Sequence, residues 1–305
     1  MENKRLKGVV QMGRVKPPFS YFGSKGRFYK EIKEIFEENY KENFIDLFAG
    51  AMEIPLSFKN EFNKLKVLAN VKDDKIECLL KEDALKVYKK GLEYINHDLE
   101  VNARDVYTDE RAKFDEENRK FKNIFSECCP CCGKRIRNKK EHEVFSEDEK
   151  MVLKILMGFG GCSTSLSNAF YSPQKLQNLE SYMKALKSIK ITNNLFDENW
   201  EFENSFIFLD PPYIQKINKE EEQFIGYNYA TDKGINWSVK DDNRLIEFIK
   251  RNQNKNNVFL VFGSVNNNLS RLLKNNFECE FIIKEYKRVT FGKLADKAEY
   301  FCLIK

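Results

Sequence analysis

Four consecutive residues, Asp210, Pro211, Pro212 and Tyr213, carry the groups needed to hold an amine. A carboxylate and a carbonyl oxygen can each accept one hydrogen of an –NH2 group, while the two prolines remove N–H donors and fix the backbone. The nitrogen lone pair then points outward at an electrophile, and the tyrosine ring offers a flat face to a planar base. The segment therefore predicts a site that presents an exocyclic amine for reaction. The simpler alternative is a Pro-Pro turn that only ends a strand.

This segment directly follows a continuous apolar run, Phe206 to Leu209, which is typical of a central parallel strand. Ligands of open α/β sheets bind beyond the carboxyl ends of such strands, which is where the segment falls. Further strands are expected at residues 44–48, 66–70 and 258–262 and near Phe281 and Tyr300, and helices at 25–40, from about 74, and around 176–189, 245–249 and 269–273. The alternation predicts an α/β protein with a mostly parallel sheet and an antiparallel closing pair.

Two turns nearer the N-terminus have residue types suited to a ligand. Gly50 ends the apolar run Phe44–Phe48 and would let the backbone approach a bound molecule closely. Lys25, in a Gly-Ser-Lys turn that begins a helix, supplies a positive charge suited to a carboxylate or a phosphate. Each turn alone is also typical of ordinary strand-to-helix packing. The prediction of a ligand site therefore depends on both turns occurring together and in this order along the chain.

In that order the segments resemble the Dam-type (D12 class) adenine-N6 DNA methyltransferases. The matching segments are Tyr21–Lys25, Phe44–Gly50, Asp210–Tyr213 and the closing strands from Tyr286 to Tyr300. The resemblance covers nearly the whole chain from Pro17 onward, apart from a charged insertion. It implies a Rossmann-like methyltransferase sheet, S-adenosyl-L-methionine as cofactor and double-stranded DNA as partner. The target adenine would be flipped out of the duplex and stacked on Tyr213.

The resemblance also implies which residues form the site. The catalytic set is Asp210, Pro211, Pro212 and Tyr213, and the cofactor set is Tyr21, Gly23, Lys25, Asp46, Phe48, Gly50, Asn70 and Phe196. The chain departs from the family pattern at Met52, where a second glycine is usual, at Asn70, where an acidic residue is usual, and at Leu195, where an aspartate commonly precedes the phenylalanine.

These departures predict weaker binding of S-adenosyl-L-methionine. They leave open a catalytically silent DNA-binding relative as one alternative to the enzyme. A second alternative keeps methyl transfer but changes the acceptor to an RNA base or a protein glutamine amide.

The segment from about residue 75 to 140 is densely charged, as in DERAKFDEENRKFKNIF. We expect residues 1–74 and 187–305 to form the catalytic domain and residues 75–186 to form an inserted, largely helical DNA-recognition domain. A basic run within it is suited either to phosphate contacts or to a solvated surface, and consists of Lys134, Arg135, Arg137, Lys139 and Lys140.

A cysteine-rich segment near residues 128–133 has the form of half a zinc knuckle. Cys129 and Cys132 are two residues apart, and Gly133 permits the backbone to turn back toward sulfur. His142 is the next candidate ligand for a structural zinc ion, but the sequence has no clear second cysteine pair. An exposed, reduced thiol-rich turn is the alternative.

The bulk composition is that of a folded globular protein. The 305 residues are 42% hydrophobic and carry a formal net charge of +5, which permits nucleic-acid binding without requiring it. No apolar run approaches the length of a membrane span, and the charged N-terminal segment lacks the features of a signal peptide. We therefore expect a soluble, cytoplasmic protein.

Overall fold

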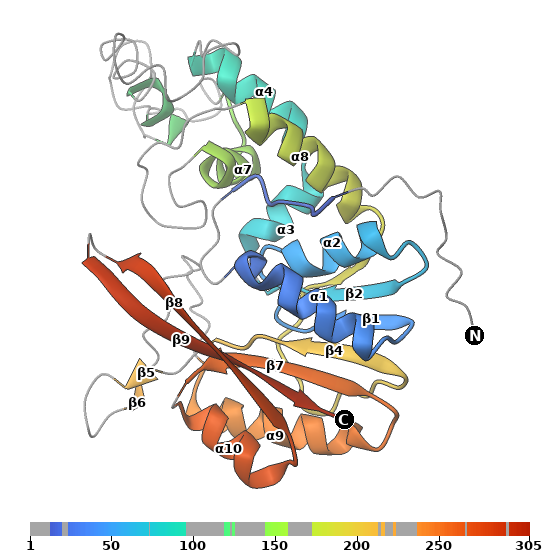
Figure 1. The fold of residues 1–305 in the computed structure, drawn as a ribbon. Helices are drawn as coiled ribbons and strands as arrows, with labels where there is room; N and C mark the ends of the chain where they lie inside the picture. The colour runs from blue at the N-terminus through green and yellow to red at the C-terminus, as the bar shows by residue number, and fades with distance from the viewer. Residues whose placement is uncertain are drawn as a thin grey trace.

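The computed structural model describes residues 13–19, 24–72, 74–95, 119–122, 124–125, 144–157, 173–212, 215–216, 222–223, 237–265, 267–290 and 293–305. Seven strands within these ranges form one mixed sheet (Figure 1). In spatial order they are β3 (Lys190–Thr192), β2 (Lys66–Asn70), β1 (Asn43–Asp46), β4 (Ser205–Leu209), β7 (Val258–Ser264), β9 (Lys293–Ile304) and β8 (Glu280–Thr290). A separate short pair consists of β5 (Gln215–Lys216) and β6 (Glu222–Gln223).

The five strands from β3 to β7 are parallel, whereas β9 runs antiparallel to both β7 and β8. This arrangement confirms the predicted mostly parallel sheet with an antiparallel closing pair. Strands β1 and β4 are direct neighbours, with Asp46 opposite Phe208. The order of strands along the chain reverses between them, and such a switch point creates the crevice in which open α/β sheets bind ligands.

Helices cover both faces of the sheet (Figure 1). One face carries α1 (Tyr29–Glu38) and α2 (Glu53–Glu61), and the other carries α9 (Val239–Gln253) and α10 (Asn268–Asn276). In β4 the side chains of Phe206 and Phe208 pack toward the first pair, and those of Ile207 and Leu209 toward the second. Burial on both faces explains why this strand reads as an unbroken apolar run.

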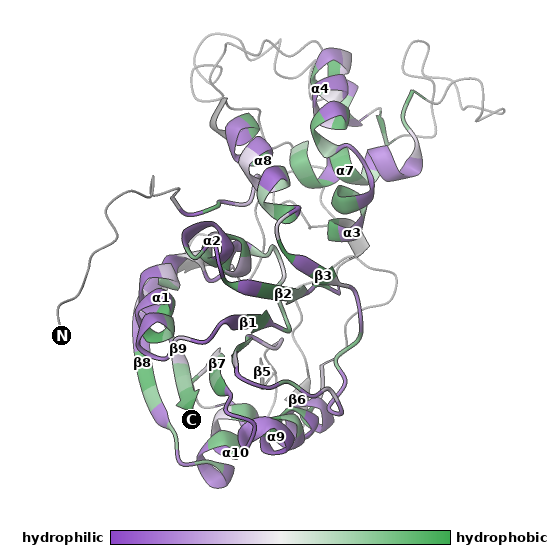
Figure 2. Cartoon of the chain, turned by 90° about the vertical axis from the view of Figure 1, so that its right-hand side faces the viewer, coloured by the Kyte–Doolittle hydropathy of each residue, from purple (hydrophilic) through white to green (hydrophobic). Residues whose placement is uncertain are grey.

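Four more helices pack together beyond the β3 edge of the sheet (Figure 2). They are α3 (Asp74–Lys81), α4 (Ala84–Ile95), α7 (Glu147–Met157) and α8 (Pro173–Leu186). Gly91 allows α4 to approach α7 closely, since a Cβ atom there would lie 2.4 Å from Leu153. Tyr182 of α8 donates a hydrogen bond of 3.1 Å to the carbonyl of Ala51, which joins these helices to the loop after β1.

The predicted helices match α1, α3, α8, α9 and α10, with one difference in extent. Helix α8 ends at Leu186, and β3 begins at Lys190, so Ile189 lies outside the helix. Strands β3, β5 and β6 and helix α2 were not predicted, and α4 and α7 were not predicted individually, although both lie in the region expected to be largely helical. Among the described residues, no helix has both the length and the hydropathy that crossing a membrane requires.

Candidate active site at the carboxyl edge of the sheet

Asp210 directly follows β4 and forms an ion pair with Lys25. The lysine Nζ lies 2.6 Å from Asp210 Oδ2, and the side chains are only 7% and 14% exposed. The same Nζ lies 4.8 Å from the ring centroid of Phe262 on β7. Lys25 immediately precedes the 3-10 helix η1 (Gly26–Phe28), so the N-terminal turn is brought against the end of the central strand. An ammonium group this close stabilises a carboxylate and fixes its orientation.

Two further carboxyl groups interact with this pair. Asp46, at the end of β1, is 2% exposed and accepts a hydrogen bond of 3.2 Å from the Phe48 N–H. Burial raises the pKa of Asp46 well above its usual range, and the Asp210 carboxylate raises it further, while the Phe48 N–H and Lys25 act in the opposite direction.

Glu299 on β9 is the third carboxyl group of the site. Burial raises the pKa of the Glu299 carboxyl, and nearby Asp210 adds to this, while Lys25, a hydrogen bond with Tyr286 and Arg27 lower it. Glu299 was not predicted as a site residue, because a single acidic residue in a C-terminal strand gives no sign that it faces a lysine near the other end of the chain.

The turn that carries Lys25 is held by Glu53, the first residue of α2. Ser24 donates its hydroxyl to Glu53 Oε2 at 2.5 Å, and Arg14 donates Nε to Oε1 at 2.8 Å. A Cβ atom on Gly26 would lie 1.9 Å from the Arg14 guanidinium and 2.4 Å from the Glu53 carboxylate, so any other residue here would have to displace these two side chains. Glu53 thus connects the Gly-Ser-Lys turn to the loop after β1.

That loop has two residues in the left-handed region. Gly50 has φ 47°, and Met52, the N-cap of α2, has φ 57°. Met52 therefore takes the backbone conformation for which glycine is usual, at a position where its side chain is completely buried. A turn that favours glycine is thus formed here with a methionine.

Asn70, at the end of β2, is buried and uses its whole amide group within the protein. Its Nδ2 donates to the carbonyls of Leu47 at 3.2 Å and Asn194 at 3.0 Å. Its Oδ1 accepts from Thr192 Oγ1 at 2.9 Å and from the Asn194 N–H at 3.0 Å. A ribose hydroxyl would have to displace one of these bonds, so the contact of Asn70 with the cofactor stays a prediction.

An aromatic cluster follows β1 and β3. Phe48 lies 5.5 Å from Phe196 and 5.3 Å from Trp237 between ring centroids, and Phe196 lies 5.9 Å from Trp237. Arg244 fixes the backbone here by donating to the Phe196 carbonyl at 3.0 Å. Leu195 beside it is 70% exposed. The predicted residues Phe48 and Phe196 are thus brought together, and Trp237 joins them without having been predicted.

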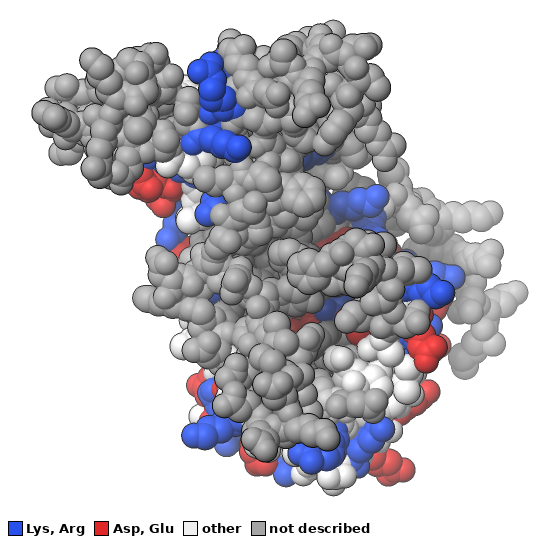
Figure 3. Space-filling view, turned by 90° about the vertical axis from the view of Figure 1, so that its left-hand side faces the viewer, with Lys and Arg blue, Asp and Glu red and all other residues white. Residues whose placement is uncertain are grey.

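Several predicted residues lie outside the described ranges: Tyr21, Gly23, Tyr213, Cys129, Cys132, His142 and the basic run of residues 134–140. Within the ranges that are described, no group of three or more His, Cys, Asp and Glu side chains is placed to hold a metal ion. On the side shown in Figure 3, the visible Lys and Arg side chains lie among visible Asp and Glu side chains over the lower part of the molecule.

The arrangement as a whole places a largely buried, ion-paired carboxylate next to the Pro211 backbone at the end of β4, beside the switch point between β1 and β4. A family model described as D12 class N6 adenine-specific DNA methyltransferase matches residues 21–291 of the chain. No curated protein matches the chain.

Proposed function

Because the chain belongs to the D12 class of N6 adenine-specific DNA methyltransferases, we propose that Asp210 and the Pro211 carbonyl accept the two hydrogens of the target amine. The family's reaction transfers a methyl group from S-adenosylmethionine to N6 of adenine in DNA, and this is the function of the chain. The match to an adenine-specific family favours this acceptor over an RNA base or a glutamine amide. Tyr213 would stack against the flipped base.

The observation that carries this assignment is the buried ion pair between Lys25 and Asp210. Lys25 engages Oδ2, and a carboxylate has further acceptor positions for the amine of the base. Because both side chains are largely removed from water, the carboxylate is held in place before the substrate arrives. Preorganised acceptors of this kind contribute to catalysis by positioning the amine and by electrostatic stabilisation, and no covalent intermediate forms.

The residues present fit S-adenosylmethionine, which supplies an electrophilic methyl group when bound. The left-handed backbone at Gly50 permits close approach of a ligand to the end of β1. The rings of Phe48, Phe196 and Trp237 provide an apolar setting for an adenine. Lys25 and Asp46 would lie toward the methionine portion, and Tyr21 and Gly23 would border it.

We also propose that residues 75–186 read the DNA. Helices α3, α4, α7 and α8 would form the scaffold of this region, and the basic residues 134–140 would contact phosphates. Cys129, Cys132 and His142 would hold a structural zinc ion. Purified protein should then contain about one zinc per chain, lost in Cys129→Ser and Cys132→Ser; a folded, active preparation without zinc would support the thiol-turn alternative. The cytoplasm remains the expected location.

The test of function is methylation-sensitive sequencing of DNA from cells that express the protein. Wild type should produce N6-methyladenine at a defined sequence, and Asp210→Ala should lower methylation by roughly 10³-fold, because the oriented acceptor is lost. Glu278→Ala removes an exposed acidic residue between α10 and β8 and serves as the control that should retain activity. Methylation by Asp210→Ala at the wild-type level, or none by wild type, would contradict the assignment.

A further inference from the structure

Glu299 lies on the face of the sheet that Lys25 approaches. In β9 it is opposite Ser264 of β7 and Lys284 of β8. Phe301, two residues further along the same face, pairs with Phe262, the ring over which the Lys25 ammonium lies. Register alone therefore brings the Glu299 carboxyl to the neighbourhood of the ion pair.

Packing holds the two elements together at this place. The ring of Phe28, in η1, lies 5.3 Å from Phe262 and 5.6 Å from Phe301 between centroids. Because η1 begins directly after Lys25, these apolar contacts fix the lysine backbone above β7 and β9. The position of Lys25 relative to Glu299 thus depends on buried aromatic contacts, not on a long surface side chain.

Three carboxyl groups lie close enough to the Lys25 ammonium in this part of the site to be affected by its charge. Lys25 interacts with Asp210 directly and lowers the pKa of both Asp46 and Glu299. If Asp210 were the only ionised carboxyl group near it, the ammonium would be drawn onto both oxygens of that carboxylate, and a target amine would have to compete for them. An ionised carboxylate on the β9 side would act against this attraction.

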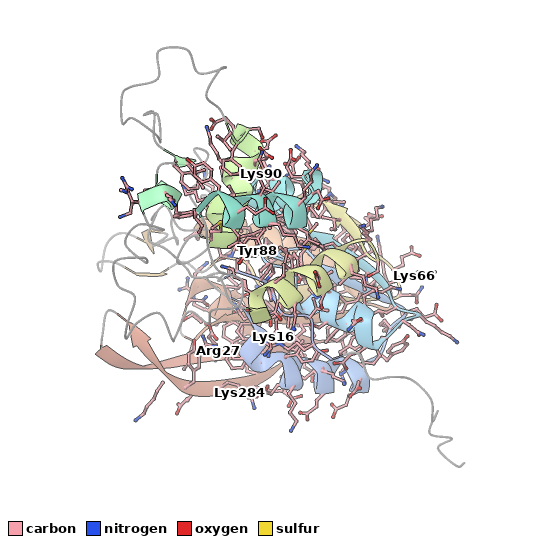
Figure 4. The ribbon with its side chains drawn as sticks, turned by 90° about the horizontal axis from the view of Figure 1, so that it is seen from above. Lys16, Arg27, Lys66, Tyr88, Lys90 and Lys284 are labelled. Atoms are coloured by element: carbon pink, nitrogen blue, oxygen red, sulfur yellow. The ribbon has the colours of Figure 1, made fainter. Side chains whose placement is uncertain are left out.

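Glu299 is itself fixed from the outer side. Tyr286 of β8 hydrogen bonds to its carboxylate, and the Arg27 guanidinium lies 4.4 Å from the centroid of the Tyr286 ring. Figure 4 shows Arg27 beside the strands of the β8–β9 hairpin, with Lys284 further along it. Lys284 pairs with Glu31 of α1 at 3.7 Å. Tyr286 is thus the group that orients Glu299 toward Lys25.

We propose that Glu299 is a positioning residue for methyl transfer: held by Tyr286, its carboxylate draws on the Lys25 ammonium from the side opposite Asp210 and keeps Asp210 able to accept the target amine. The proposal rests on the methyl-transfer function given above. Glu299 touches neither base nor cofactor in this account and acts through Lys25. Only its ionised form can do so, since a neutral carboxyl group would not attract the ammonium comparably.

The test is the pH dependence of kcat for wild type, Glu299→Gln and Tyr286→Phe. Wild-type kcat should rise with pH as Glu299 ionises. Glu299→Gln should lower kcat about tenfold with little change in the KM for DNA, and should remove this part of the rise. Tyr286→Phe should move the rise to higher pH, because the lost hydrogen bond lowered the pKa of Glu299. Lys25, Arg27, Asp46, Asp210 and Lys284 are unchanged in both variants.

Glu285→Gln, an exposed neighbour of Tyr286 on β8, is the matched control and should leave the profile unchanged. Carboxyl 13C NMR of the cofactor-free protein gives a readout apart from activity: the signal that disappears in Glu299→Gln should titrate above its ordinary range, and higher still in Tyr286→Phe.

The outcomes separate the two proposals. A wild type that never methylates DNA overturns the function, whereas an active wild type whose profile is unmoved in both variants overturns the role of Glu299. If Glu299→Gln fails to fold, Tyr286→Phe decides alone. A merely structural Glu299 would lower thermal stability without moving the rise in kcat.

Discussion

Two neighbouring parts of the same sheet edge use polar residues in opposite ways. Near the carboxyl ends of β1, β4 and β7, the charged or titratable groups of Lys25, Asp46, Asp210 and Glu299 interact with one another, with Glu299 lying within β9 opposite the last residue of β7. At the end of β2, the neutral amide of Asn70 donates two hydrogen bonds to the protein and accepts two from it. In the proposed function the first part acts on the substrate, whereas the second holds the backbone after β1 to the backbone after β3.

The difference teaches how an isosteric exchange should act in each part. In the charged part, exchanging a carboxylate for an amide alters the coupled titration of its neighbours. In the neutral part, exchanging an amide for a carboxylate replaces satisfied N–H donors with oxygens that repel the neighbouring carbonyls. The expected effect is a lower free energy of unfolding. The predictions below, from the largest expected effect to the smallest, test this contrast.

The first prediction is that Asn70→Asp destabilises the fold. The carboxylate would lose the two donors that Asn70 offers to the carbonyls of Leu47 and Asn194 and would face those oxygens at close range. Leaving the buried Leu47 carbonyl and the partly buried Asn194 carbonyl in this state costs roughly 2–4 kcal/mol in the free energy of unfolding. Urea denaturation at neutral pH measures this loss.

Asn63→Asp makes the same exchange at an exposed turn and should change stability little. If Asn70→Asp is as stable as wild type and binds S-adenosylmethionine more tightly in calorimetry, the side chain serves the cofactor and the contrast between the two parts is broken.

A second prediction concerns pH. Asp46 has a raised pKa in the folded protein, so folding is favoured where its carboxyl is protonated. This contribution to stability is present below the ordinary pKa of aspartate and is lost as pH rises through the folded-state pKa. Asp46→Asn keeps the acceptor for the Phe48 N–H but cannot titrate. Its stability relative to wild type should therefore increase from pH 5 to pH 8.

Denaturation curves at several pH values give the comparison, with the exposed Asp83→Asn as control. Parallel curves for wild type and Asp46→Asn would show that burial of Asp46 does not perturb its titration. The coupling proposed for the charged part would then lose its support.

The sequence predicted the central strand β4 and its carboxyl end better than their surroundings. The run Phe206–Leu209 and the residues after it could be placed because burial on both faces leaves a local apolar signature. Glu299 and Trp237 could not, since each joins the site through register or packing between segments far apart in the chain. Strand β3 is only three residues long and shows no alternation. The partners of Asn70 likewise depend on the loop after β3, which no local pattern describes.

The smallest effect is expected for the difference between two variants of Met52, a residue whose backbone conformation favours glycine and whose side chain is buried. Its left-handed φ of 57° costs a residue with a Cβ atom roughly 1 kcal/mol relative to glycine. Its fully buried side chain contributes more than that, because removing it leaves a cavity. Both Met52→Gly and Met52→Ala should therefore be less stable than wild type.

The sharper measurement at Met52 is the difference between its two variants. Each removes the same packing apart from one methyl group, but only glycine relieves the backbone. Met52→Gly should therefore be more stable than Met52→Ala by about 1 kcal/mol, the reverse of the order at an ordinary right-handed position in a helix. Thermal unfolding of the pair decides the matter. Greater stability of the alanine variant would mean that the loop before α2 relaxes, and that its shape is not fixed by the packing around Met52.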